Sequence, residues 1–445
     1  MDNCDCAICK HQHDFELPKD LIEDLISDRL VLFTGAGIST ESRNVLNFTF
    51  YDHIVGELNY ENCELSFPDL MEEYCKQVNG RIKLLSKIRH RFEHIKSFPE
   101  MLGVATRFHL ELSTIHKINT IITTNWDTYF EDKCDAVPFV SDQDLVFWNT
   151  KERKVLKIHG SINNYGSIVA TAKDYDVCLE KLDTGLIGSI LKGILATKTV
   201  VFIGYSLSDS DFNNIYSFVA KQMQDFQRQA YIVTPFHDER EKFKSLGLIP
   251  IITDGAYFLS QLKCHLVEQE VMLPDSFYVL AEALRVKILE EHKLLHDTYN
   301  CFDHPQIIIA SSYQDGMLHA LERVDALKSS GKYSDPYYIP SVFKPYLDWR
   351  QRKLKNKIYE DVAYIEGYIY ALAYLTMDEE TKSKMGPPPL FYAFGVKKPI
   401  YTLDQFSQVI DDLPSLHKSS YKRTLQMVAK LKSTSGIDFH HPPWL

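Results

Sequence analysis

Short apolar segments, several of them rich in β-branched residues, constrain the fold of this chain more than any other feature. Residues 199–203 (TVVFI) are the clearest example, and each segment predicts a buried strand. The others are residues 30–33, 118–123, 155–158, 230–233 and 249–252. Helical patterns, notably at 186–196 and 209–224, separate some of them. Apolar strands that alternate with helices are typical of a mostly parallel sheet covered on both faces. We therefore predict a doubly wound α/β domain over residues 19–270.

The rest of the 445 residues differs in character. Residues 1–18 are polar and rich in thiols. Residues 271–445 predict a mainly helical domain for assembly or partner docking, with helices near 277–299, 313–329, 355–376 and 416–433. The run at 306–310 is a strand candidate, prolines at 387–389 indicate a rigid loop, and His440 and His441 are expected in an irregular tail.

Charge and composition exclude some functions. The formal net charge is −11, and binding to nucleic acid needs a local excess of Lys and Arg, so no direct nucleic-acid partner is expected. The basic run at 344–357 is interpreted as a solvated helix face. No apolar run is long enough to span a bilayer, and the nine cysteines do not form a secreted disulfide pattern. We expect a protein of the reducing cytoplasm.

Four polar motifs lie at the carboxyl ends of strand candidates. They are GAGIS at 35–39, TTNWD at 123–127, IHG at 158–160 and GYSLSD at 204–209. In an α/β sheet, ligands bind at the carboxyl ends of the strands, so these motifs are expected to converge. Glycines in the first motif would let the backbone approach a phosphate where a helix begins.

The ordered set of motifs resembles the sirtuin (silent information regulator) family, whose corresponding pieces are GAGxS, TQNxD, HG and GTS. The resemblance covers about residues 30–255 and lies in short motifs. It implies a Rossmann domain that binds NAD. The residues that match the pyrophosphate loop are Gly35, Ala36, Gly37 and Ser39, and those that match the nicotinamide-ribose end are Asn125 and Asp127. His159 matches the catalytic histidine, Gly204 and Ser206 match the loop at the phosphates and adenosine ribose, and Asp254 lies near the family's adenine contact without a supporting motif.

These residue types suit cleavage of the nicotinamide–ribose bond, which passes through an oxocarbenium-like state as in other glycoside hydrolysis. The Asn125 amide can donate and accept, so it can orient a water or the ribose. His159 titrates near neutrality and can act as a general base. A histidine packed in the core beside a turn glycine is the alternative for this residue taken alone.

Two departures from the family pattern bear on the reaction. Deacylating sirtuins carry a GIPDFR-like segment after GAGxS, whereas residues 41–47 read ESRNVLN. They also usually carry a four-cysteine zinc module, whereas only Cys178 lies between His159 and Gly204. The sequence instead resembles the sirtuin-like effectors of bacterial anti-phage defence, which implies hydrolysis of NAD to nicotinamide and ADP-ribose. By the same analogy we expect a homo-oligomer and a partner protein such as an ATPase.

Alternatives remain at this point. The chain could be a protein deacylase or ADP-ribosyltransferase, or a non-catalytic sensor of NAD or ADP-ribose, although binding alone needs neither Asn125 nor His159. Cys4, Cys6 and Cys9, with His11 or His13, could hold zinc. The Cys-x-Cys spacing is unusual for paired ligands, so we favour a thiol-rich segment without metal.

Overall fold

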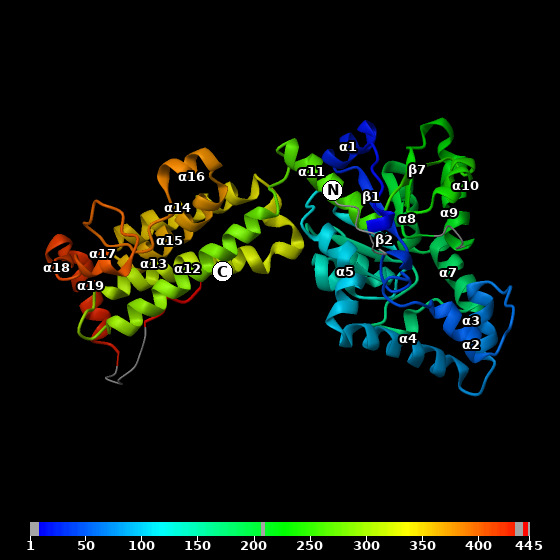
Figure 1. Ribbon diagram of the computed structural model, residues 1–445, viewed down its shortest axis with the longest axis horizontal. Helices are drawn as coiled ribbons and strands as arrows, with labels where there is room; N and C mark the ends of the chain where they lie inside the picture. Colours follow the sequence, from blue (N-terminus) through cyan, green and yellow to red (C-terminus); the bar gives the residue numbers. More distant parts are fainter. Residues whose placement is uncertain (1–8, 206–209, 432–438, 444–445) are drawn as a thin grey trace. The chain divides into compact units, whose positions relative to one another are not determined.

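The computed structural model describes residues 9–205, 210–431 and 439–443. The chain divides into two compact units (Figure 1). The first unit comprises Met1–Gln269 and Ser329–Gly331, and the second unit comprises Glu270–Lys328 and Lys332–Leu445. Each unit has its own core, and each is described separately below.

The first unit is built on a seven-stranded sheet in the order β3-β4-β2-β1-β5-β6-β7. Every strand pair is parallel, as the alternation of apolar segments and helices predicts. In the centre of the sheet, Leu32 pairs with Ile121 on one side and Val201 on the other. The strands are β1 (Leu30–Thr34), β2 (Thr120–Thr123), β3 (Val137–Phe139), β4 (Lys154–Lys157), β5 (Thr199–Ile203), β6 (Ala230–Thr234) and β7 (Leu248–Ile252).

Helices cover both faces of this sheet (Figure 1). Phe33 and Phe202 belong to a core shared with α7 (Ala172–Thr184), α8 (Leu186–Thr197) and α9 (Ser210–Met223). Because side chains alternate along a strand, Ile203 points to the opposite face. There it meets the start of α11 (Gly255–Glu268), beside α5 (Pro99–Ser113). The sheet is therefore buried on both sides, which explains its continuous apolar strands.

Three further helices form a module with a small core of its own, and we call it the helical module. It consists of α2 (Phe50–Glu57), α3 (Phe67–Cys75) and α4 (Gly80–Ser97). Local signals start two of these helices: Thr49 caps α2 in a capping box with Asp52, and Ser66 caps α3. Ile168 and Ala170, from the segment after β4, complete the module's core. The chain beyond β4 thus connects the sheet to the helical module.

The second unit is helical, and α13 (Ile307–Ala326) runs through its core. Its neighbours are α12 (Ser276–Thr298), α14 (Tyr338–Lys355) and α15 (Tyr359–Thr376). Glycines allow the backbones of α13 and α15 to approach closely. A Cβ at Gly316 of α13 would collide with the Tyr364 carbonyl of α15, and a Cβ at Gly367 of α15 would collide with the Tyr313 carbonyl of α13. Shorter helices follow at α16 (Glu379–Met385), α17 (Leu403–Ser407), α18 (Leu413–Leu416) and α19 (Lys418–Val428).

Two local expectations were wrong, and one strand was missed. The strand candidate at 306–310 is the start of α13, because its apolar run is buried on all sides of a helix. The GAGIS motif opens only a 3₁₀ turn, Ala36–Ile38, and not an α-helix. The short strand β3 was missed, since Pro138 removes a donor and is tolerated only because β3 is an edge strand.

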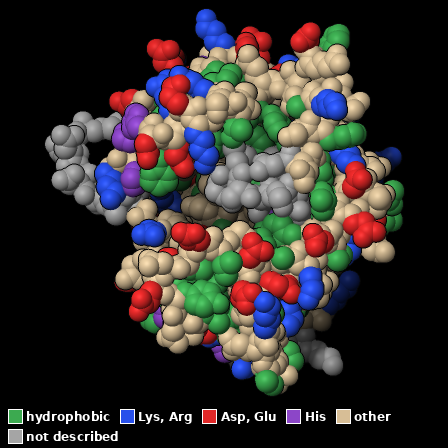
Figure 2. Space-filling view, turned by 90° about the vertical axis from the view of Figure 1, so that its right-hand side faces the viewer, with side chains coloured by type: hydrophobic (Ala, Val, Ile, Leu, Met, Phe, Trp, Pro, Cys, Tyr) green, Lys and Arg blue, Asp and Glu red, His purple; other side chains and the backbone are tan. Residues whose placement is uncertain are grey.

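The surface shown in Figure 2 carries Lys and Arg side chains interspersed with Asp and Glu, together with scattered hydrophobic residues. Within the described part of the chain, no helix combines the length and the apolar composition that crossing a bilayer requires.

Candidate active site

Four neighbouring strands of the sheet end at the candidate site. Strands β4, β2, β1 and β5 are consecutive in the sheet and parallel. The motifs that follow them contain His159, Asn125, Gly35 and Gly204, respectively. Strand order therefore places the four motifs side by side along one carboxyl edge, where ligands of α/β sheets bind.

A buried polar network joins two of these motifs through Ser39. The Asn125 Nδ2 lies 3.4 Å from the Ser39 Oγ, and this hydroxyl donates to the Asp127 Oδ2 at 3.1 Å. The other carboxylate oxygen of Asp127 accepts from the Tyr129 backbone amide at 3.1 Å. Because Ser39 has a single proton, donation to Asp127 leaves its oxygen to accept from Asn125. The network thus fixes which end of the Asn125 amide faces Ser39.

The other end of that amide is the Oδ1 oxygen. Asn125 is 3% exposed, and its Oδ1 has no hydrogen-bond partner among the described residues. Its backbone is held in place, since the Asn125 amide nitrogen donates to the Thr123 Oγ1 at 3.1 Å. A buried acceptor without a partner costs free energy unless a water or ligand supplies a donor. The Oδ1 is therefore suited to accept from a bound hydroxyl or water.

The glycines of the first and fourth motifs bring their loops into backbone contact. The Gly35 amide donates to the Ile203 carbonyl at 3.1 Å, and the Gly37 amide donates to the Gly204 carbonyl at 3.0 Å. A Cβ at Gly35 would lie 2.5 Å from the Gly204 carbonyl oxygen, and one at Gly37 would lie 2.9 Å from it. Gly204 itself has a φ of +61°, a conformation that favours glycine. These glycines are required for packing between loops.

His159 ends the neighbouring strand and is 3% exposed. Its ring meets the Tyr175 ring of α7 edge-on at 5.0 Å between centroids. Gly160 has a φ of +86°, and a Cβ there would collide with the Ser167 carbonyl. Two residues further on, the Ile162 amide donates to the Trp126 carbonyl at 2.8 Å. The loop that carries His159 is thereby tied to the loop that carries Asn125.

A buried lysine beneath this loop has no role in the sequence interpretation. Lys157, whose side chain is fully buried, donates to the Asp127 carbonyl and lies 3.0 Å from the Glu131 Oε1. Burial raises the pKa of Glu131, while the lysine beside it opposes that shift. Because β4 also begins with Lys154, a lysine in this strand did not mark a buried ion pair, and no sequence signal identified Lys157. Lys157 therefore supports the turn that presents Asn125 and Asp127.

A second buried cation organises the segment that departs from the deacylase pattern. Arg91 of α4 lies 3.0 Å from the Glu41 carboxylate and donates to the Thr40 and Phe48 carbonyls, both at 3.0 Å. The second oxygen of Glu41 accepts from the Phe50 amide at 2.7 Å. Burial raises the pKa of Glu41, and Arg91 counteracts this effect. The helical module thus holds residues 40–50 beside the site, and neither partner has a motif that sequence reasoning could use.

The remaining predicted residues are Asp254, Ser206 and the N-terminal thiols and histidines. Asp254 caps α11, because its Oδ1 accepts from the Ala256 and Tyr257 amides at 3.0 Å. The same oxygen accepts from Arg107 at 2.6 Å. Ser206 lies outside the described residues, as do Cys4, Cys6 and the side chain of Cys9. The His11 ring contacts Phe236 and the His13 ring contacts His237.

Comparison with known proteins agrees with this geometry. Residues 119–251 match the family model of the SIR2-like domain, and this range contains β2, β4, Asn125 and His159. The parallel sheet with these motifs at its carboxyl edge agrees with this match, so residues 119–251 are similar to a SIR2-like domain.

The chain is also similar to several curated proteins over about half of its length. The chain is 27% identical over 234 residues to "Defense-associated sirtuin 2" of Bacillus subtilis, which covers 49% of this chain and 22% of that protein. It is 24% identical over 229 residues to "NAD(+) hydrolase ThsA" of Bacillus cereus (strain MSX-D12), and the match covers 50% of this chain and 46% of that protein. The protein of the same name from Cytobacillus dafuensis is 28% identical over 221 residues, and the match covers 48% of this chain and 43% of that protein. The chain thus spans less than half the length of these relatives.

Proposed function

We propose that this chain is an NAD glycohydrolase, which cleaves NAD to nicotinamide and ADP-ribose. The observation that carries the proposal is the buried Asn125 amide at the shared strand edge, whose Oδ1 has no partner among the described residues. That oxygen would accept from the attacking water or from a hydroxyl of the ribose. The relatives named as NAD(+) hydrolases support the choice of substrate.

The chemistry balances with the groups that the site offers. A water oxygen bonds to C1′ of the nicotinamide ribose while the C1′–N bond breaks, with an oxocarbenium-like transition state. The bonding electrons neutralise the cationic ring nitrogen, so nicotinamide leaves uncharged and needs no acid. The proton of the water goes to His159 and then to solvent. One base and one orienting amide are therefore sufficient.

The other residues have supporting roles in this proposal. Ser39 and Asp127 position the Asn125 amide through the hydrogen bonds that join them. Residues that would line the dinucleotide are Gly35, Ala36, Gly37, Gly204, Ser206 and Asp254. The substrate would then extend along the carboxyl edge of the sheet, from β2 toward β5 and β7.

Hydrolysis is favoured over transfer to an acyl-lysine for a structural reason. Cys178 is the single cysteine between His159 and Gly204, and it is buried in α7 with its Sγ 3.4 Å from the Ile158 carbonyl oxygen. It therefore belongs to the core of the sheet domain. Since a structural zinc site needs about four ligands, this part of the chain cannot form the zinc module of deacylases.

We further propose that the enzyme is a regulated, cytoplasmic effector of bacterial anti-phage defence, as the name of the Bacillus subtilis relative suggests. Uncontrolled hydrolysis of NAD would be toxic, so activity must wait for a trigger. Residues 19–270 would be the catalytic domain. Residues 271–445 would mediate self-association or docking of a partner protein such as an ATPase.

The test is incubation of the purified full chain with NAD, following nicotinamide and ADP-ribose by chromatography. We expect turnover without an acceptor, lost in Asn125→Ala and His159→Ala and retained in the exposed-residue controls Asn163→Ala and His90→Ala. A parallel assay in bacteria tests an enzyme that needs a cellular trigger: the parent and the two controls should deplete cellular NAD, whereas Asn125→Ala and His159→Ala should spare it. O-acetyl-ADP-ribose formed with an acetylated peptide, or turnover unchanged in both site variants, would contradict the proposal.

A further inference from the structure

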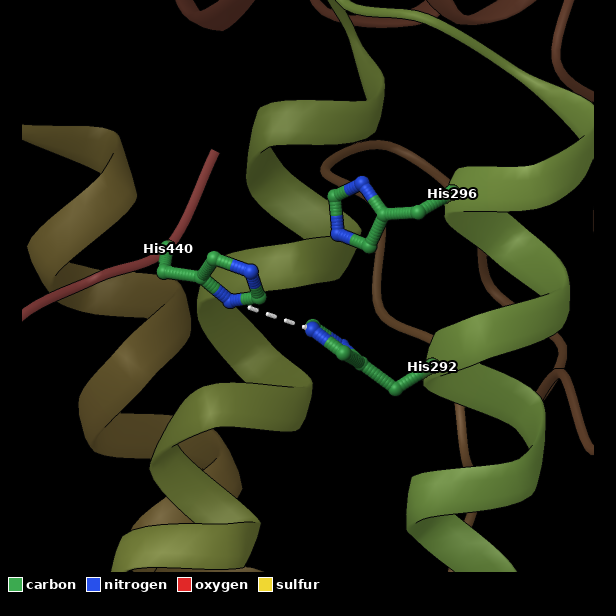
Figure 3. A group of neighbouring side chains, drawn as sticks. All are labelled: His292, His296 and His440. Atoms are coloured by element: carbon green, nitrogen blue, oxygen red, sulfur yellow. Dashed lines mark hydrogen bonds between the residues drawn. The ribbon is translucent and has the colours of Figure 1, made fainter. Parts of the chain in front are cut away.

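Three histidines of the second unit converge at a place remote in sequence from the site described above (Figure 3). His292 and His296 stand one turn apart on α12, and His440 comes from the segment 439–443. One ring nitrogen from each lies within 4.8 Å of the other two. We propose that these three imidazoles, with the carboxylate of Asp315, bind a Zn²⁺ ion.

The distances between donor atoms approach those of a tetrahedral site. Zn–N bonds of about 2.0–2.1 Å put neighbouring ligand atoms about 3.3–3.4 Å apart. The His292 Nε2 lies 3.3 Å from the His440 Nδ1, as the dashed line in Figure 3 marks. The Asp315 Oδ1 lies 3.4 Å from the His440 Nδ1 and 3.7 Å from the His292 Nε2. Three of the four donors are thus spaced as neighbouring ligands of a tetrahedral site, and a ring nitrogen of His296 lies within 4.8 Å of the donor nitrogens of His292 and His440.

A partner outside the cluster sets the tautomer of His292. The Gln314 Nε2 donates to the Leu390 carbonyl at 3.0 Å, so the Gln314 Oε1 is the atom that faces the His292 Nδ1 at 3.0 Å. An amide oxygen only accepts, and the His292 Nδ1 must therefore carry the proton. The lone pair then lies on Nε2, which points at His440. Metal-binding histidines are oriented by the same kind of second hydrogen bond.

The other ligands are also held in place. Ser311 lies 3.1 Å from the His296 Nε2 and donates to the Phe439 carbonyl at 2.6 Å. The second oxygen of Asp315 accepts from the His441 amide at 2.7 Å. His441 is buried and stacks on Tyr364 with 4.2 Å between centroids. The predicted irregular tail is therefore docked on α13 and α15 and presents His440 to α12.

The donor set suits zinc in particular. Neutral imidazoles and a carboxylate are its usual non-thiolate ligands, whereas Mg²⁺ and Ca²⁺ prefer oxygen alone. Asp315 is 4% exposed, and a buried carboxylate is costly without a cation close by. A bound Zn²⁺ would supply that charge and would clamp residues 439–443 onto α12 and α13. Zinc would thus control whether this segment stays docked.

The experiment uses the full chain with Cys4, Cys6 and Cys9 changed to serine, so that the N-terminal thiols cannot contribute. After chelator treatment, Zn²⁺ is titrated by calorimetry, and Co²⁺ is added separately to record its visible spectrum. The main variant is His440→Ala, because this side chain is 56% exposed and its loss leaves no buried cavity. The control is His304→Ala, since that histidine lies in the same unit and contacts Tyr299.

We expect one Zn²⁺ per chain in the parent and in His304→Ala, with affinity at least about tenfold weaker in His440→Ala. Hydrogen exchange in residues 439–443 should slow on adding Zn²⁺ to the parent but not to His296→Gln, a second variant that keeps a polar side chain. Equal zinc affinity in the parent and His440→Ala would overturn the proposal, as would a folded parent that binds no zinc. Neither readout depends on NAD hydrolysis.

Discussion

His109 makes the stability of the first unit depend on pH in a way that can be calculated. It lies on α5, is fully buried, and neither ring nitrogen has a hydrogen-bond partner among the described residues. Its ring packs against Phe130 at 4.5 Å and Tyr129 at 5.5 Å between centroids. Desolvation by burial lowers its pKa from 6.5 to about 4, although the nearby Asp127 opposes the shift. The folded protein therefore keeps this histidine neutral.

The sign follows from proton linkage. Between pH 6.5 and pH 4 the unfolded chain binds a proton at His109 that the folded chain does not, so the free energy of unfolding decreases as pH falls. At pH 5 the ratio of the two binding terms, (1 + 10^1.5)/(1 + 10^−1), is about 30, which corresponds to about 2 kcal/mol. At pH 7.5 the contribution of this group to the pH dependence is negligible. Solvent does not screen this contribution to the free energy of unfolding, since the ring is fully buried.

The variant His109→Phe removes the titration while keeping a ring in the same aromatic surroundings. We expect the parent to lose about 2 kcal/mol more than this variant between pH 7.5 and pH 5. The measurement is native-state hydrogen exchange of β1 and β2 amides, corrected for the intrinsic effect of pH on exchange. Other titrating groups are common to both proteins and cancel in the comparison. An equal pH dependence in both would refute the reasoning and would mean that folded His109 accepts a proton.

Two further substitutions test the site and its support. Gly35→Ala should abolish the proposed NAD hydrolysis, because the new Cβ would lie 2.5 Å from the Gly204 carbonyl oxygen. The control Gly103→Ala should retain activity, since its Cβ would have no atom within 4 Å. Equal rates of NAD hydrolysis in the two variants would contradict the role of Gly35 in loop packing. Lys157→Met should destabilise the fold by about 3–5 kcal/mol in denaturant titrations, since it leaves Glu131 buried without its cation. Adding Glu131→Gln should restore part of that loss, and a double variant no more stable than the single one would show that the ion pair is not the cause.

Periodicity predicted most of the sheet but could not decide every element. The apolar segments that form β1, β5 and β6 alternate with helices along the chain. This pattern predicts a parallel sheet with helices on both faces. The run at the start of α13 has the same apolar character, yet it is helical. A helix buried all round and a buried strand look alike in sequence. Packing against α12 and α15 made the difference.

The candidate site shows the same division. The motifs that contain Ser39, Asn125 and Asp127 could be identified from sequence, because each follows an apolar segment. Their contacts span 86 and 88 residues, and they form only because β1 pairs with β2. The Asn125 Oδ1 has no hydrogen-bond partner among the residues that the structure describes. This is a consequence of strand pairing and of burial, neither of which is a property of the motif itself.

The sequence by itself determined which residue types stand at the ends of the strands and the order in which they occur, since strand propensity and turn chemistry are local. The tertiary structure alone decided which distant side chains meet. Lys157 beneath the Asp127 turn, Arg91 beside Glu41, and His440 against α12 carry no local signal. The physical reason is that desolvation and ion pairing depend on which segments are neighbours in space. A buried charge or imidazole acquires its pKa, its partner and its role from that neighbourhood.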